Sequence, residues 1–265
     1  MMPKIITKQE KASLLLSELN YFRAGSKVKD ISHGQLCWLE EFNQISAATI
    51  LHNVNGTRAL AEVEWLDRVK TLFSRLGASQ YRFYLTQFDD SHIERLKQFG
   101  LQVTVELGML GHLEDIGNAD FHDAGELVLI DDDRALSLKR KLYQECEVGA
   151  DGHQMQNGVF ADYEQVKCNS GYMSSYLYYH NNRLKGTVSL ALEGRFARLK
   201  NLYIHPKYRG QGSGKPLVTG LMTIAKEQGA EVFGTYALQG GISQRLYSSC
   251  GLRPCISQVE GVGQL

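Results

Sequence analysis

The stretch "RGQGSGK" (residues 209–215) lies between an apolar segment, "NLYIHPKY", and a segment with helical spacing, "PLVTGLMTIAKEQGA". Glycine lets a backbone approach a ligand closely, and the N-terminus of a helix attracts anions. Three glycines among basic residues, where a strand ends and a helix begins, therefore predict a phosphate-binding loop. Which phosphate ligand it binds depends on the spacing of these glycines.

Two common phosphate loops do not fit this spacing. A Walker A loop requires G-x-x-x-x-G-K-[ST], but Arg209 stands at the first glycine position and Pro216 at the hydroxyl position. A dinucleotide fingerprint requires G-x-G-x-x-G, whereas Gly210, Gly212 and Gly214 are spaced G-x-G-x-G. The sequence therefore does not favour a P-loop nucleotidase or an NAD- or FAD-binding protein.

The elements around the loop predict the fold class. From residue 126 onward the sequence predicts the order β-α-α-β-β-β-loop-α-β-α-β. The segments "YMSSYLYYH", "RLKGTVSLAL" and "RFARLKNLYIHP" read as an antiparallel meander, with turns at "NN" and "EG". We expect an α/β (α+β) fold with a mixed, mainly antiparallel sheet flanked by helices.

The chain is long enough for two domains. The polar segment "EDIGNADFHDAG" reads as a linker over residues 114–125, which separates domains over 1–113 and 126–265. Residues 75–101 can be laid over residues 227–252 with a one-residue gap, so the first domain reads as a second, tandem copy. In the first copy, the segment "TRALAE" (residues 57–62) stands at the position that corresponds to the glycine loop, and Leu96 stands at the position that corresponds to Tyr247. An unrelated α/β domain is the alternative.

Composition excludes several classes of protein. The chain has 265 residues, with 29 basic and 29 acidic side chains, and so lacks the charge of a typical nucleic-acid binder. No apolar run reaches the ~20 residues that span a bilayer, and the N-terminus lacks a cleavage pattern, so we expect no membrane partner and a cytoplasmic location. The cysteines show no C-x-x-C spacing, which indicates reduced thiols and no metal site. They are Cys37, Cys146, Cys168, Cys250 and Cys255.

Read from Arg209, the loop has the pattern R-x-x-G-x-G, completed by Gly212 and Gly214. The segment "NLYIHPKYRGQGSGKPLV" resembles the acetyl-CoA-binding motif of the GNAT superfamily of N-acetyltransferases, Q/R-x-x-G-x-G/A. The later segment "SQRLYSSCGL" is similar to the family's helix that carries a tyrosine. The resemblance covers about residues 125–265, roughly half of the chain.

This resemblance implies acetyl-CoA as co-substrate. Backbone N–H groups of the loop would bind the pyrophosphate, basic side chains would stand at its rim, and the pantetheine arm would lie beside the fourth strand. The residues implied to bind acetyl-CoA are Leu202, Ile204, Arg209, Gly210, Gln211, Gly212, Ser213, Gly214 and Lys215.

The resemblance also implies a catalytic role. Tyr247 matches the family's tyrosine that gives a proton to the departing thiolate. Glu145, Glu147, His153 and Glu193 are all candidates for a general base. Direct attack by an amine held close to the thioester, with no dedicated base, is equally open.

Two further features have alternative interpretations. The strand "YLYYH" places Tyr176, Tyr178, Tyr179 and His180 either around an acceptor pocket or in the core and on the surface, and we favour the second. His205 matches the family's strand end, where we expect a structural role.

The predicted function is an acetyl-CoA-dependent N-acetyltransferase that acts on a primary amine of a small molecule or peptide. The first domain would be a degenerate copy without the loop. A non-catalytic acyl-CoA-binding or regulatory module is the alternative, and a longer acyl donor stays open. We also expect a short last strand, whose free edge either the first domain or a partner chain in a homodimer would cover.

Overall fold

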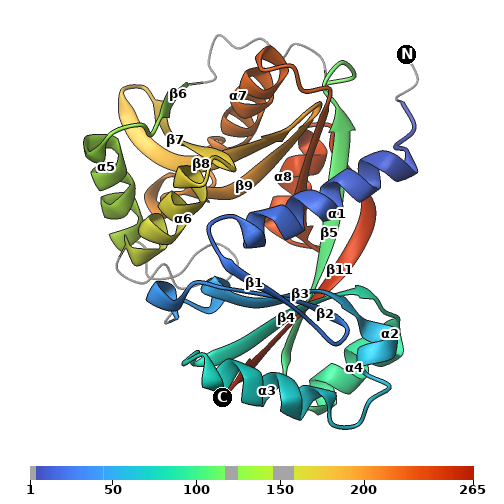
Figure 1. Ribbon diagram of the computed structural model, residues 1–265. Coiled ribbons are helices and arrows are strands. Elements are labelled where there is room, and N and C mark those ends of the chain that lie inside the picture. The colour runs from blue at the N-terminus through green and yellow to red at the C-terminus, as the bar shows by residue number, and fades with distance from the viewer. Residues whose placement is uncertain (1–3, 44, 117–124, 146–157) are drawn as a thin grey trace. The chain divides into compact units, whose positions relative to one another are not determined.

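The computed structural model describes residues 4–43, 45–116, 125–145 and 158–265 (Figure 1). The chain forms two compact units. The C-terminal unit comprises Met1–Ser17 and Gly108–Cys255, and the N-terminal unit comprises Glu18–Leu107 and Ile256–Leu265. Each unit therefore contains one terminal segment from the opposite half of the sequence.

The first part of the chain alternates strands with short helices. Its elements are α1 Lys8–Arg23, β1 Lys27–Ile31, β2 Gly34–Trp38, η1 Glu40–Phe42, η2 Ser46–Ala48, β3 Thr49–Asn55, α2 Gly56–Ala59, α3 Trp65–Arg75, β4 Gln80–Gln87, α4 Asp90–Gln98 and β5 Gln102–His112. In the N-terminal unit the strand order is β1-β2-β3-β4-β11, where β11 is the last strand of the chain, Arg253–Gln264. Strands β3 and β4 are parallel, and the other neighbours with a described register are antiparallel.

The core of the N-terminal unit follows from helical and strand spacing. Helix α3 buries Trp65, Val69 and Phe73, which lie four residues apart on one face. Trp65 packs edge-on against Phe83 of β4, with ring centroids 5.1 Å apart. Helix α4 begins at a capping box, in which the Asp89 carboxylate accepts from the His92 backbone N–H.

The second part of the chain has the predicted order of elements. These are β6 Glu126–Leu129, α5 Asp133–Gln144, α6 Val159–Asn169, β7 Met173–His180, β8 Arg183–Glu193, β9 Phe196–Ile204, η5 Pro206–Tyr208, α7 Gly214–Glu227, β10 Val232–Leu238, α8 Ile242–Ser249 and β11 Arg253–Gln264. In the C-terminal unit the strand order is β5-β10-β9-β8-β7-β6. The expected mixed, mainly antiparallel sheet is confirmed.

Local chemistry explains the meander and its helices. Strands β7, β8 and β9 are antiparallel, and Asn181 and Asn182 connect the first two with φ angles of 53° and 57°. Helices α5 and α6 cover one face of the sheet and α7 the other (Figure 1). Neighbouring residues of β6 lie on the two faces. Val128 packs on the core under α5 and α6, whereas Leu127 lies opposite α7, where a Cβ atom added at Gly220 would come within 3.3 Å of its side chain.

The two halves of the chain repeat one order of elements. Strands β1, β2 and β3, then α3, β4, α4 and β5, correspond to β7, β8 and β9, then α7, β10, α8 and β11. The third and fourth strands of both sets are parallel. Helix α2 and the turn after it stand where the second set has its glycine loop. Leu96 of α4, fully buried, stands at the place of Tyr247 in α8.

The unit boundaries differ from the expected 1–113 and 126–265 because long-range pairing decides them. Residues Val259–Gln264 of β11 pair with β4 and so belong to the N-terminal unit. The start of α1 belongs to the C-terminal unit, where the Tyr172 hydroxyl and the Arg198 guanidinium both donate to Ser17. The last strand is also longer than expected, at 12 residues. Most of the expected linker, residues 117–124, lies outside the described residues.

Candidate functional site

The glycine loop connects β9 to α7, as the sequence predicts. Gly210 and Gly212 have φ angles of 72° and 80°, which favour glycine. A Cβ atom at either position would meet no heavy atom within 4 Å, so backbone conformation, and not crowding, requires glycine here. The Gln211 side chain donates to the Lys207 carbonyl (2.7 Å) and braces the loop. The loop thus holds a defined conformation with open space above its glycines.

The backbone N–H groups of the loop are available to a ligand. The first helical hydrogen bond of α7 runs from the Leu217 N–H to the Ser213 carbonyl (3.3 Å). In the described part of the chain, the N–H groups of residues 210–215 donate to no backbone or side-chain acceptor. The Ser213 hydroxyl is buried and also lacks a partner among the described residues. Unpaired donors at the positive end of a 14-residue helix form a site that attracts anions.

Basic side chains stand at both ends of the loop. Arg209 Nε donates to the Ile204 carbonyl (2.9 Å), and its guanidinium lies 5.6 Å from the centroid of the Tyr203 ring. This anchors Arg209 to the end of β9. Lys215 is exposed and has no ion pair within the described ranges. Both charges add to the positive potential of the loop.

Strand β9 separates from β10 in its first half, well before the glycine loop begins. The two strands pair only from Phe196 to Arg198. Beyond this point the Thr235 hydroxyl of β10 donates to the Leu199 carbonyl (3.2 Å), so a side chain replaces the backbone ladder. Over the rest of β9, which includes Leu202 and Ile204, no register with β10 is found among the described residues. This edge can accept an extended, amide-bearing ligand.

A bulge bends β9 within the same stretch. Asn201 has a φ angle of 51°, and the register between β8 and β9 shifts between Thr187 and Ser189. The Asn201 side chain hydrogen-bonds to the buried carboxylate of Glu164 on α6, which also accepts from the Tyr143 hydroxyl (2.9 Å). The two helices on this face of the sheet therefore support the bulge.

This buried cluster was missed by the sequence analysis. Burial raises the pKa of the Glu164 carboxyl, and the neighbouring Lys139, Tyr143 and Asn201 oppose that shift. The signal present in the sequence was weak. Lys139 stands in the basic run "KRK", which is typical of an exposed helix face.

Tyr247 lies on α8, which packs against the start of α7. Its side chain is buried, with 5% exposed. The preceding residue, Leu246, lies beneath the loop, since a Cβ atom at Gly214 would come within 3.1 Å of its side chain. Helix α8 therefore brings Tyr247 into the neighbourhood of the loop.

Among the base candidates, Glu145 lies beside the loop. His205 Nδ1 accepts from the Lys207 N–H (3.2 Å), so Nε2 carries the proton and donates to Glu145 (2.9 Å). His205 also caps the short η5 helix, which gives it a structural role. Glu193 pairs with Phe196 at the opposite end of β9. Glu147 and His153 lie outside the described residues.

The aromatic strand mostly forms core. Tyr176 and Tyr178 of β7 are buried, at 6% and 0% exposed. Tyr179 is half-buried and packs on the core under α5 and α6. His180 Nδ1 accepts from the Lys185 ammonium (3.0 Å). These positions favour packing over an acceptor pocket.

Three further observations concern the whole chain. No helix in the described ranges is both long and apolar enough to cross a membrane. Among the same residues, no cluster of three or more histidine, cysteine or acidic side chains could hold a metal ion. The described cysteines, Cys37, Cys168, Cys250 and Cys255, are free, and Cys146 lies outside the described residues.

Strands β7 to β10, the glycine loop and Tyr247 all lie within one segment, residues 139–252. Residues 139–252 match the model of the acetyltransferase (GNAT) family. The C-terminal half of the chain therefore contains a GNAT domain. No curated protein sequence matches the chain.

Solved structures share the fold over nearly the whole chain. A conserved protein of unknown function from Staphylococcus epidermidis has 12% identity and a TM-score of 0.66, and the match covers 94% of this chain and 99% of that one. A GCN5-related N-acetyltransferase from Kribbella flavida has 12% identity and a TM-score of 0.63, over 95% and 94%. A tandem GNAT protein from the clavulanic acid biosynthesis pathway has 10% identity and a TM-score of 0.53, over 99% and 97%. At these identities the likeness concerns the fold.

Proposed function

We propose that the protein transfers the acetyl group of acetyl-CoA to a primary amine, and that the C-terminal unit performs the reaction. One observation carries this proposal. The backbone N–H groups of residues 210–215 are unpaired among the described residues, at the end of a strand edge that β10 leaves open. Coenzyme A contains both a pyrophosphate, which the loop could bind, and a chain with amide groups, which the open edge of β9 could bind.

The residues of the loop and strand fit the two parts of coenzyme A. The N–H groups of Gly212 and Gly214 would donate to pyrophosphate oxygens, and Lys215 would add charge at the rim. The open edge of β9 around Leu202 and Ile204 would hydrogen-bond to the amides of the pantetheine arm.

The chemistry needs few groups from the protein. The amine nitrogen attacks the thioester carbonyl, an amide bond forms, and the carbon–sulfur bond breaks. Tyr247 gives its hydroxyl proton to the thiolate, and the proton lost by the amine reaches solvent directly or through Glu145. Tyr247 then regains a proton from solvent, which returns the protein to its starting state. Holding the amine against the thioester supplies much of the rate.

The acceptor is a primary amine on a small molecule or peptide. A non-catalytic acyl-CoA-binding or regulatory module is the second candidate, since the loop and the β9 edge serve binding equally well. The buried Tyr247 favours the enzyme, because a binding module needs no proton donor.

Calorimetric titration of acetyl-CoA and CoA tests the cofactor site. Gly212→Glu places a carboxylate in the loop, and Gly171→Glu is the matched control. Both glycines have positive φ angles and open space around a Cβ atom, but Gly171 lies between α6 and β7, away from the loop. We expect Gly212→Glu to weaken binding by at least about tenfold and Gly171→Glu to leave it unchanged. Equal binding by both variants, or no binding by folded wild type, would overturn the proposal.

A further inference from the structure

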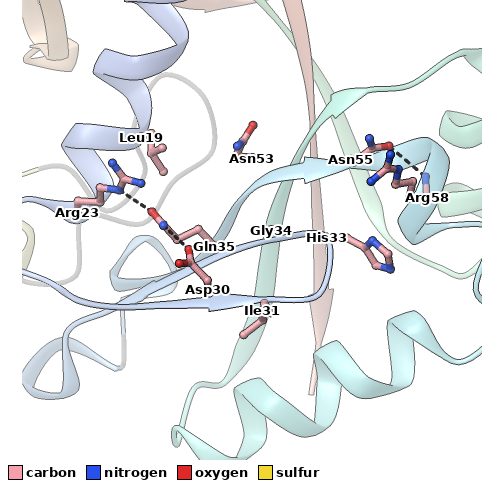
Figure 2. A pocket seen from close by; sticks show the side chains of 10 residues that line it. All are labelled: Leu19, Arg23, Asp30, Ile31, His33, Gly34, Gln35, Asn53, Asn55 and Arg58. Atoms are coloured by element: carbon pink, nitrogen blue, oxygen red, sulfur yellow. Dashed lines mark hydrogen bonds between the residues drawn. The ribbon is translucent and has the colours of Figure 1, made fainter.

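The N-terminal unit contains a polar hollow of about 510 Å³, within the size range of small-molecule sites (Figure 2). Its walls come from the end of α1, the β1–β2 hairpin, the end of β3 and α2. Figure 2 shows Arg23, Gln35 and Asp30 at one end and Asn55 and Arg58 at the other. The hollow shares no residue with the glycine loop, because all of its lining residues belong to the N-terminal unit.

One end of the hollow presents a cation and an anion together. Arg23 Nε donates to Gln35 Oε1 (2.5 Å), and Gln35 Nε2 donates to Asp30 Oδ1 (2.6 Å). The Gln35 side-chain amide thus holds both the Arg23 guanidinium and the Asp30 carboxylate in place. Within the described chain, the Arg23 Nη groups and Asp30 Oδ2 have no other partner. This arrangement matches the carboxylate and ammonium of an amino acid.

The other end presents a second cation. Asn55 accepts from the Arg58 backbone N–H (3.1 Å) and donates to Gln87 (2.7 Å), so the backbone at Arg58 is held in place. The Arg58 guanidinium forms no ion pair or hydrogen bond with any described residue. It is available for a second acid group.

Two residues around the hollow have a left-handed backbone conformation. His33 and Asn53 line it with φ angles of 70° and 56°, which are uncommon for residues other than glycine. The His33 carbonyl accepts from the Asn55 N–H (3.0 Å), and the His33 ring faces Glu62 (2.5 Å). These two contacts hold His33 in this conformation.

The position of the hollow also points to a ligand site. It lies at the end of β3, where the corresponding strand of the second half, β9, leads into the glycine loop. The segment "TRALAE" offers no glycine for a pyrophosphate. A different ligand chemistry is therefore expected at this place in the first half.

We propose that the hollow binds a free acidic amino acid. Its α-carboxylate pairs with Arg23, its ammonium with Asp30, and its second acid group with Arg58. Two guanidinium groups and one carboxylate give this lining a net charge of about +1, which complements a ligand with two carboxylates and one ammonium. The His33 ring is excluded from this sum because it faces Glu62.

The test is titration of the full chain with L-glutamate, L-glutamine and glutarate. Glutamine lacks the second acid group, and glutarate lacks the ammonium. We expect glutamine and glutarate each to bind at least about tenfold more weakly than glutamate, since each loses one charged contact. Equal binding of glutamate and glutamine, or no binding of any of the three probes, would overturn the proposal.

Two substitutions assign the contacts. Arg58→Gln should weaken glutamate binding about tenfold and leave glutamine binding unchanged, and Asp30→Asn should weaken glutamate and leave glutarate unchanged. Arg75→Gln and Asp67→Asn are the controls, because both residues are exposed on α3 of the same unit and do not line the hollow. Circular dichroism checks that every variant folds. If the Arg58 and Asp30 variants bind all probes as their controls do, the proposed contacts are wrong.

Discussion

Lys139 and Glu164 form an ion pair (Nζ–Oε2 2.6 Å) in which both side chains are buried, at 2% and 0% exposed. Lys139 also donates to the Ser175 hydroxyl (3.0 Å) on β7. The pair thus joins α5, α6 and the sheet. Because Glu164 also holds Asn201, a charge pair inside the unit supports the bulge next to the proposed coenzyme A edge.

Breaking this pair should be costly. Glu164→Gln leaves the buried Lys139 ammonium without its counter-charge, and the expected loss is about 3–5 kcal/mol of unfolding free energy. Urea denaturation followed by circular dichroism measures it. Arg140 and Asp162 pair across the same two helices (2.6 Å) but are about 40% exposed, so Asp162→Asn should cost less than about 1 kcal/mol. Equal losses in the two variants would contradict this account.

The buried Tyr84 should make the stability of the protein fall as the pH rises above 10. Burial, with the nearby Glu260 and Glu106 carboxylates, raises the pKa of the Tyr84 hydroxyl well above 10 in the folded protein. The unfolded chain therefore loses this proton first. The contribution of Tyr84 to the free energy of unfolding is therefore full below pH 10. It is lost as the pH rises further, by about 1.4 kcal/mol per pH unit.

The measurement is urea unfolding of wild type and Tyr84→Phe between pH 8 and pH 11. Tyr84→Phe loses the hydrogen bond from the hydroxyl to Glu260 (2.7 Å), so it should be less stable at pH 8. Its disadvantage should shrink above pH 10, because phenylalanine has no proton to lose. A constant difference across this range would show that the hydroxyl ionises equally in both states.

The sequence predicts the local part of this structure well. The "NN" pair at residues 181–182 predicts a hairpin turn, and both asparagines adopt the left-handed conformation that such a turn requires. The glycine loop and the order of elements after residue 125 follow from equally local signals. Each of these features is determined by residues close together in the sequence, which is why the sequence predicts it.

Long-range pairing was not predictable in the same way. The alternation in "CISQVEGV" indicates a strand, but a strand pattern fixes which face is buried and not which strand lies beside it. The pairing of residues Val259–Gln264 with β4 therefore appears only in the structure. The Lys139–Glu164 pair was missed for a related reason, because the spacing in the sequence does not show that a charged residue is buried.

Thr235 should affect acetyl-CoA binding. Its hydroxyl replaces the backbone ladder where β9 and β10 separate, by donating to the Leu199 carbonyl. Thr235→Val removes this donor at the start of the open edge, and we expect binding to weaken about fivefold, which corresponds to about 1 kcal/mol. Thr86→Val is the control, because the Thr86 hydroxyl donates to the Val54 carbonyl (3.4 Å) between the corresponding strands β3 and β4 of the N-terminal unit. The control should lose stability but keep its affinity, and equal affinity losses would contradict the role of Thr235.

Tyr247→Phe distinguishes an enzyme from a binding module. If the Tyr247 hydroxyl protonates the departing thiolate, its removal should lower kcat by about 10²-fold to 10⁴-fold and leave the affinity for CoA unchanged. Release of free thiol, measured with a panel of primary amines, gives kcat, and calorimetry gives the affinity. Tyr176→Phe is the control, since Tyr176 is similarly buried at 6% exposed and lies on β7, so it should change stability without changing kcat. An unchanged kcat in Tyr247→Phe would remove Tyr247 from the mechanism. CoA binding by wild type without turnover of any amine would instead favour the binding module.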